Sequence, residues 1–232
     1  MSSIGLAVEV PVASFRMPYA REYAESYELP PPATVYGMLL SLVGETDRHR
    51  HVGARVAIAR PSAKGCPEPE RSVVLRTFRR IKKKPVSDST NARPDFQEVL
   101  TGLCLTIWVD SEAESGHRPT LVDRIKDAFR FPNTVERFGG LSLGESRDLV
   151  DSVFLLSEQP PHGTQYSAGT PCVWLRRDEI GPLTMPYWVD HVGSAKTLWA
   201  SYRLTEGSLA EPDADCWTEI TPVSEVRQTT GQ

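Results

Sequence analysis

The chain of 232 residues is poor in the features that identify several large protein classes. No apolar run approaches the roughly 18 residues of a transmembrane helix, and polar residues interrupt the N-terminal stretch too often for a signal peptide. The cysteines have no CxxC pair, which argues against a zinc site and a disulfide framework; they are Cys66, Cys104, Cys172 and Cys216. We therefore expect a reduced, cytoplasmic protein with no metal, no cofactor and no membrane partner.

Motifs that mark common enzymes are absent as well. The chain has no P-loop ending GK[ST], no GxSxG nucleophile elbow and no HExxH zinc motif. The run GGLSLG follows a predicted helix and precedes a predicted strand, whereas a dinucleotide-binding fingerprint requires the reverse order. No carboxylate or cysteine cluster stands beside His49 and His51, so we interpret this pair as part of a solvated loop.

A metal-free ribonuclease would need only a general base and a general acid, often histidine, tyrosine or lysine. Tyr36, Lys83 and His117 offer such side chains, but nothing in their spacing groups them. The sequence therefore predicts no catalytic residues, and binding is the better expectation.

Positive charge is concentrated in one segment of an acidic chain. The whole chain has a net charge of −4, but the segment from Arg71 to Arg93 alone has +7, which leaves −11 for the rest. Such a concentration is typical of a polyanion-binding site, and nucleic acid is the commonest polyanion. Against one acid, Asp88, the segment has the basic residues Arg71, Arg76, Arg79, Arg80, Lys82, Lys83, Lys84 and Arg93.

Two features favour a binding site over a merely solvated charge run. Apolar residues such as Val73, Leu75 and Phe78 are interleaved with the basic ones, unlike in a disordered tail. Turn-forming residues follow in PVSDSTNARPD, and then the apolar run VLTGLCLTIWV. Strand, polar tip and strand make a long β-hairpin, which we expect at about residues 71–110 as a projecting basic finger.

The remaining pattern up to residue 158 predicts an α+β domain. An amphipathic helix follows the prolines of LPPPATVYGMLLSLVGE and ends at Gly44, and a second helix begins near Thr120 with capping-box spacing to Asp123. Further strands are expected at residues 4–12, 55–59 and 151–158. The order β-α-β-β-α-β is that of a ferredoxin-like (RRM-like) fold, in which two helices cover a four-stranded antiparallel sheet.

Residues 159–232 have a weaker pattern. The runs CVWLRR, PYWVD and TLWASYRL look like short strands between glycine and proline turns. We predict a small C-terminal β appendage with a flexible tail, separate from the domain at residues 1–158. The chain length is compatible with two such parts, since domains average about 150 residues.

The block SYELPPPATVYGMLLSLVGE, from Ser26 to Glu45, resembles the fifth family of CRISPR-associated proteins (Cas-five), part of the RAMP superfamily. In that family a similar polar-Pro-Pro-x-Thr-hydrophobic-Tyr-Gly-hydrophobic-Leu pattern leads into the first helix. The basic hairpin is similar to the thumb of the family, and RFGGLSLGES is similar to its glycine-rich loop. The resemblance covers about residues 4–158.

The resemblance implies a CRISPR RNA-binding subunit of a type I surveillance complex (Cascade) that serves antiviral defence. Such a subunit caps the 5′ handle of the CRISPR RNA (crRNA). Its RAMP core lies between the terminal backbone subunit (Cas-seven) and the large subunit (Cas-eight), and target DNA is recognised within the complex. The repeat-processing endonuclease (Cas-six) would be an indirect partner, and the chain itself would not be an enzyme.

The resemblance also implies contacts for individual residues. A single-stranded handle is bound through its phosphates by arginine and lysine, through stacking on aromatic rings, and through backbone N–H groups. Phosphate contacts would come from Arg76, Arg79, Arg80, Lys82, Lys83 and Lys84. Gly139, Gly140 and Gly144 would let the RNA backbone approach closely. Arg16, Tyr19 and Arg21 would contact the handle.

Two alternatives remain open. In one branch of the family the protein cleaves precursor RNA with a Tyr, Lys and His site, so the chain is alternatively a metal-independent endoribonuclease, with Tyr36 and His117 as the residues to test. The other alternative is a general RNA-binding or protein-interaction module, which would not prefer a CRISPR repeat over scrambled RNA.

Overall fold

The structure is a computed structural model that describes residues 3–19, 23–62, 66–79, 92–114, 118–158, 166–190 and 196–222. Its helices are α1 (Pro32–Leu42) and α2 (Leu121–Arg130), with short 3-10 helices at Pro132–Thr134 and Ala214–Cys216. Its strands are β1 (Ser3–Ala13), β2 (Tyr23–Ala24), β3 (Arg55–Pro61), β4 (Glu70–Arg79), β5 (Ala92–Asp110), β6 (Ser152–Leu155), β7 (Pro171–Arg177), β8 (Leu183–Val189), β9 (Thr197–Ser208) and β10 (Thr218–Glu219).

These strands form one mostly antiparallel sheet with the order β6-β1-β5-β3-β7-β9-β8. Strands β2 and β4 also pair with β5, β2 in the parallel direction, and β10 pairs with β3. Along the chain the elements β1, α1, β3, β5, α2 and β6 follow one another, and their four strands are neighbours in the order β6-β1-β5-β3. The prediction of an α+β protein with an antiparallel sheet is confirmed.

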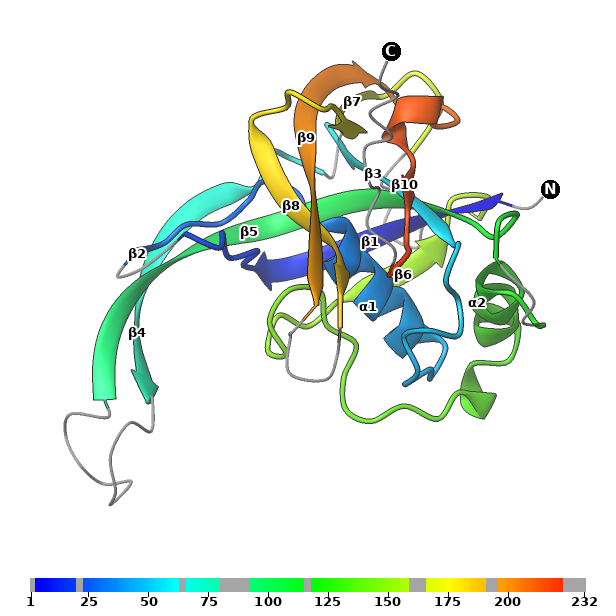
Figure 1. Cartoon of the computed structure of the whole chain (residues 1–232), viewed down its shortest axis with the longest axis horizontal. Helices are drawn as coiled ribbons and strands as arrows, with labels where there is room; N and C mark the ends of the chain where they lie inside the picture. Colours follow the sequence, from blue (N-terminus) through cyan, green and yellow to red (C-terminus); the bar gives the residue numbers. More distant parts are fainter. Residues whose placement is uncertain are drawn as a thin grey trace, which may run out of the picture.

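Helices α1 and α2 lie on the same face of the sheet (Figure 1). Alternate residues of a strand point to the same face, so Val8 of β1 and its partner Leu105 of β5 both enter the core under the helices. Tyr36 of α1 is fully buried in this core, as expected for a helix residue that faces the sheet.

The ends of both helices follow from local sequence. Helix α1 begins at Pro32, where the missing N–H costs nothing, and Gly44, just beyond its end, has the positive φ of +66° that favours glycine. At the start of α2, Thr120 Oγ1 accepts a hydrogen bond from the Asp123 N–H at 3.2 Å, and Asp123 Oδ2 accepts one from the Thr120 N–H at 3.1 Å. The predicted capping box is confirmed.

Strand β5 belongs to two parts of the molecule. Along one edge its first half pairs with β4, from Glu70 opposite Thr101 to Arg79 opposite Ala92, and its second half pairs with β3. Along the other edge β1 pairs with β5 as far as Leu100. Gly102, just beyond the β4 pairing, has a φ of +72°. The β4–β5 hairpin extends away from the body of the protein (Figure 1). The predicted tip, residues 80–91, lies outside the described residues.

The C-terminal strands extend the same sheet. Strand β7 pairs with β3, with Trp174 opposite Ala59. Strand β8 packs against α1, and the ring centroids of Trp188 and Tyr36 are 6.4 Å apart. Leu175, Met185 and other residues of β7 to β9 belong to the same core cluster as the N-terminal strands. The region is β-rich as expected but shares its core with residues 1–158, and a domain boundary at residue 158 stays a prediction.

The prediction that all cysteines are reduced is wrong for Cys66 and Cys104. These two residues form a disulfide with their Cα atoms 5.8 Å apart, which joins the segment before β4 to the middle of β5. They are 38 residues apart in the chain and become neighbours only when the strands pair. Cys172 and Cys216 are buried free thiols, and burial raises the pKa of each to about 11.

The described part of the chain contains no helix that is long and apolar enough to span a membrane.

Candidate nucleic-acid interface

The glycine-rich loop, residues 137–146, is anchored by a buried carboxylate. Asp148 Oδ2 accepts hydrogen bonds from the backbone N–H groups of Ser14 and Glu145, each at 3.0 Å. Burial raises the pKa of Asp148, although these two N–H groups oppose the rise. Leu143 of the loop is fully buried in the core. The loop is therefore attached to the body of the protein at both Leu143 and Glu145.

Glu145 ties this loop to the base of the hairpin. Arg76 Nη1 on β4 lies 3.2 Å from Glu145 Oε2, and the Gln97 side-chain amide on β5 donates to Glu145 Oε1 at 2.9 Å. Arg147 bonds to Glu145 and also donates to Gln97 Oε1 at 3.2 Å. We call Arg76, Gln97, Glu145 and Arg147 the hairpin-base cluster. It brings together the glycine-rich loop and the basic hairpin, which are far apart in the sequence.

The three predicted glycines have different surroundings. At Gly144 (φ +112°) a Cβ atom would lie 2.8 Å from Asp148 Oδ2, so this glycine is required by the anchor of the loop itself. A Cβ at Gly140 would lie 2.9 Å from a methyl group of Leu149. At Gly139 (φ +81°) no atom lies within 4 Å of the Cβ position. Gly139 therefore offers the open surface that a close approach of RNA requires.

The predicted basic residues of the hairpin are only partly described. The Arg76 side chain is 20% exposed and forms the ion pair with Glu145. The backbone of Arg79 pairs with Ala92, inside the hairpin. The others, Arg80, Lys82, Lys83 and Lys84, lie outside the described residues.

Of the predicted handle contacts after β1, Arg16 is exposed and pairs through its backbone with Ser26. Tyr19 is 86% exposed, which suits a stacking role better than a packing role. Arg21 lies outside the residues that the structure describes.

Of the three candidate acid–base residues, the structure describes only Tyr36. Tyr36 is buried, its hydroxyl donates to the Arg48 carbonyl oxygen at 2.8 Å, and burial raises its pKa well above the ordinary value. Lys83 and His117 lie outside the described residues.

The interpretation of His51 as part of a solvated loop is wrong. Its side chain is fully buried, and its Nδ1 lies 2.8 Å from Glu114 Oε2. Its Nε2 lies 3.2 Å from Arg124 Nη1, and Arg124 also forms an ion pair with Glu45. We call Glu45, His51, Glu114 and Arg124 the buried cluster. It joins the end of α1 to the start of α2.

An exposed apolar strip on the hairpin was missed from the sequence. Leu75 of β4 lies opposite Phe96 of β5, which in turn lies beside Tyr23 of β2. With Val73, these side chains are 41–64% exposed. A strand period of two places Val73 and Leu75 on one face, so the sequence predicted a shared face but not that the face is open.

Comparisons with known proteins identify the family of this chain. The family model described as "CRISPR-associated protein (Cas_Cas5)" matches residues 3–176. The chain belongs to the Cas5 family of CRISPR-associated proteins. It is 44% identical over 213 residues to a CRISPR-associated protein Cas5 from Myxococcus xanthus (strain DK1622), a match that covers 90% of this chain and 93% of the relative. The resemblance carried by Ser26 to Glu45 is thus confirmed.

The fold of this Cas5-family chain is also found in a solved structure. A chain of a "CRISPR RNA-guided surveillance complex" superimposes with a TM-score of 0.57 at 14% sequence identity, over 90% of each chain. At this identity the likeness establishes the fold, a mostly antiparallel sheet with few helices.

Proposed function

We propose that this chain is the crRNA-binding subunit of a type I Cascade complex, where it caps the 5′ handle of the crRNA. Membership of the Cas5 family supports this proposal, and so does the fold shared with a chain of an RNA-guided surveillance complex. The observation that carries it is the hairpin-base cluster, because Glu145 holds the glycine-rich loop against the basic hairpin.

In this proposal the sheet order β6-β1-β5-β3, with α1 and α2, is a ferredoxin-like RAMP domain. The β4–β5 hairpin is the thumb that lies over the guide RNA. A single-stranded handle would cross the glycine-rich loop near Gly139 and continue to the hairpin, where arginines and lysines contact its phosphates.

The proposed complex supplies the other partners. The chain would contact the backbone subunit (Cas-seven) and the large subunit (Cas-eight), and it would take part in target DNA recognition in antiviral defence. Its location would be cytoplasmic. Disulfides are rare in that compartment, but Cys66 and Cys104 are both buried, which limits attack by reducing thiols.

We propose that the chain binds RNA without cleaving it. A general base must reach the proton that it abstracts, and Tyr36 is buried with its hydroxyl already bonded to a backbone carbonyl.

One experiment tests binding and cleavage together. The purified full-length chain is incubated with labelled repeat–spacer RNA in EDTA and analysed on native and denaturing gels. We expect a shifted complex with intact RNA. Cleavage at one position would favour the endoribonuclease, and equal binding of scrambled RNA would favour a general RNA-binding module.

The salt dependence of binding then tests the thumb. Replacing Lys82, Lys83 and Lys84 with Ala should reduce the slope of log K against log salt by about 0.7 for each lost phosphate contact with single-stranded RNA. As a control of equal charge, Arg118, Lys126 and Arg130 at α2 are replaced instead. Equal slopes in both variants would contradict the phosphate contacts of the hairpin.

A further inference from the structure

A cavity of about 510 Å³ lies between α1 and the start of the glycine-rich loop. Its wall includes Gly37 and Arg48 on the side of α1, and Arg137 and Phe138 on the side of the loop. This volume is within the range of small-ligand sites, about 300–1,000 Å³. No residue of this wall belongs to the hairpin-base cluster.

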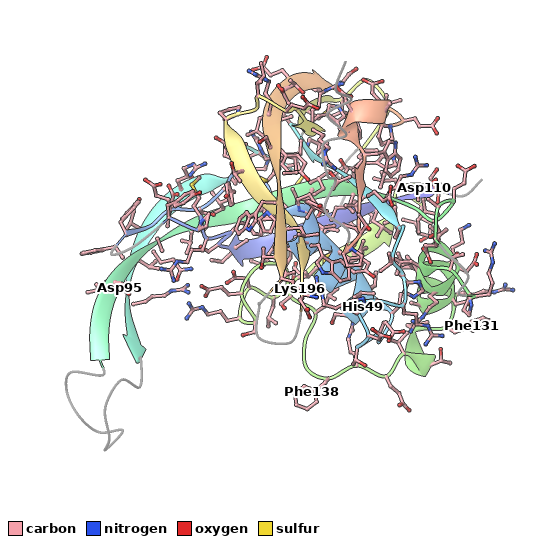
Figure 2. All side chains as sticks on the ribbon, viewed as in Figure 1. His49, Asp95, Asp110, Phe131, Phe138 and Lys196 are labelled. Carbon is pink, nitrogen blue, oxygen red and sulfur yellow. A yellow bond between two sulfur atoms is a disulfide. The ribbon has the colours of Figure 1, made fainter. Side chains whose placement is uncertain are left out.

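Phe138 is the most exposed large apolar residue among those described, at 106% of its reference area. Figure 2 shows its ring pointing away from the ribbon, with no other labelled side chain over it. Phe131, in the same connection between α2 and β6, is 50% exposed and has Arg130 over its ring at 5.3 Å. Both faces of the Phe138 ring are therefore available to a flat partner such as a base.

Arg48 brings a partly desolvated cation to the same cavity. Burial is the main cause that lowers the pKa of Arg48. Its Nη2 donates to the Ala33 carbonyl oxygen at 3.3 Å, whereas its buried Nε has no hydrogen-bond partner. Within the described ranges no carboxylate lies at ion-pair distance from Arg48, unlike Arg76, Arg124 and Arg176, although Asp190 is near enough to oppose the lowering of its pKa.

Gly37 of α1 lies beside this guanidinium group. A Cβ atom at Gly37 would lie 3.4 Å from Arg48 Nη1, an ordinary van der Waals contact, so the arginine packs directly against the helix at this position.

The wall of the cavity contains the carboxylates Glu45 and Glu136 as well as Arg48 and Arg137. Arg124 and Arg50 both form ion pairs with Glu45, so arginines outnumber carboxylates around the cavity. Arg137 is exposed and makes no ion pair with any residue that the structure describes. Arginine side chains outside the described ion pairs, beside a free aromatic ring, match the two parts of a nucleotide, its phosphate and its base.

We propose that this cavity binds one nucleotide of single-stranded RNA, unstacked from its neighbours, with its base on Phe138 and its phosphate at Arg48 and Arg137. The inference rests on the proposed function and adds a discrete nucleotide site to it. The glycine-rich loop runs from this cavity to Glu145, so one RNA strand can occupy the cavity and then reach the hairpin.

The test uses the full-length chain and RNA that carries the repeat-derived handle. We expect Phe138→Ala to weaken binding about tenfold, the scale for loss of one base–aromatic stack, and Arg137→Ala to weaken it several-fold with a lower salt slope. The matched controls Phe131→Ala and Arg130→Ala should change the affinity less than twofold. Both phenylalanines are exposed, so neither variant should unfold the protein.

A series of RNAs with one abasic position each identifies the nucleotide. At one position the abasic RNA should bind wild type and Phe138→Ala equally, because the same stack has already been lost. If Phe138→Ala weakens binding equally for every abasic RNA, or not at all, the nucleotide site is wrong.

Failure of the site and failure of the function give different results. If replacing the hairpin lysines weakens RNA binding while Phe138→Ala does not, the proposed function stands and the cavity is not a nucleotide site. If Phe138→Ala affects only assembly with the other subunits, the cavity is a protein contact. If wild type does not bind the RNA, the proposed function itself fails.

Discussion

Two clusters of ion-paired side chains in this protein differ in how far they are exposed to solvent. In the buried cluster the His51 and Glu114 side chains are 0% and 1% exposed. In the hairpin-base cluster Arg76 and Glu145 are 20% and 30% exposed, and Arg147 is 49% exposed. The first joins two helices of the body, and the second joins the two segments that we assign to RNA binding.

The difference lies in which hydrogen-bonding groups stay available. Glu114 accepts hydrogen bonds from His51, from Ser111 and from the backbone N–H of Leu121, so it has no capacity left for a ligand. Arg76 has five N–H donors and uses one on Glu145. The phosphate contacts that we propose for Arg76 would use the N–H donors that Glu145 leaves free.

The largest effect should come from the buried cluster. We expect Glu114→Ala to lower the free energy of unfolding by about 3–5 kcal/mol, because it leaves buried donors without their acceptor. Urea unfolding followed by circular dichroism measures this change. Glu112→Ala is the matched control, since this side chain is 75% exposed and 3.7 Å from Arg55; we expect a loss below about 1 kcal/mol. Equal losses would mean that burial does not distinguish the two glutamates.

The hairpin-base cluster should give a smaller and more local effect. We expect Glu145→Ala to cost about 0.5–1.5 kcal/mol. It should also speed amide exchange at the start of β5 without changing β7 or β9, because Glu145 holds only the hairpin and the loop. Hydrogen exchange with mass spectrometry reports both regions. Glu70→Ala, an exposed acid on the same hairpin, should leave exchange unchanged. Faster exchange throughout the sheet would show that the cluster stabilises the whole fold.

What the sequence predicts well is local. The capping box needs only Thr120 and Asp123, and the end of α1 needs only Gly44, so residues close in the chain contain the information. The resemblance to the family added the prediction that the hairpin and the glycine-rich loop contribute to RNA binding.

What could not be predicted depends on distant pairing. The Cys66–Cys104 disulfide requires the segment before β4 to lie beside β5, and the Arg76–Glu145 ion pair requires the glycine-rich loop to lie beside the hairpin. His51 was misassigned for the same reason, since its partner Glu114 is 63 residues away. The Phe138 cavity was missed because exposure of an apolar side chain is a property of the folded surface.

The smallest expected effects concern the pH dependence of stability. As the pH rises, the contribution of Asp148 to stability should fall and that of Glu45 should increase. Burial raises the folded-state pKa of Asp148, so the stability contributed by its proton is present below the unfolded pKa of about 4 and is lost as the pH rises through the folded pKa. Burial also acts to raise the pKa of Glu45, but hydrogen bonds from Asp47 and Arg124 outweigh it and lower the pKa. The contribution of Glu45 is therefore present above its unfolded pKa and is lost as the pH falls through the folded pKa.

We expect Asp148→Asn and Glu45→Gln to change the pH dependence of stability in opposite directions, each by less than about 1 kcal/mol between pH 3 and 7. Urea midpoints at steps of pH measure both. Asparagine at position 148 keeps one oxygen for the N–H groups of Ser14 and Glu145. Glutamine at position 45 keeps the oxygen that accepts from Thr46 and Asp47 but turns an NH2 group toward Arg124, so only the pH dependence of the stability, and not its absolute value, is compared. Asp127→Asn, on the exposed side of α2, is the control and should follow wild type. A change of the same sign in both variants would contradict the difference between the two carboxylates. It would mean that hydrogen bonds outweigh burial at Asp148 too, and that the folded protein holds Asp148 mainly in its charged form.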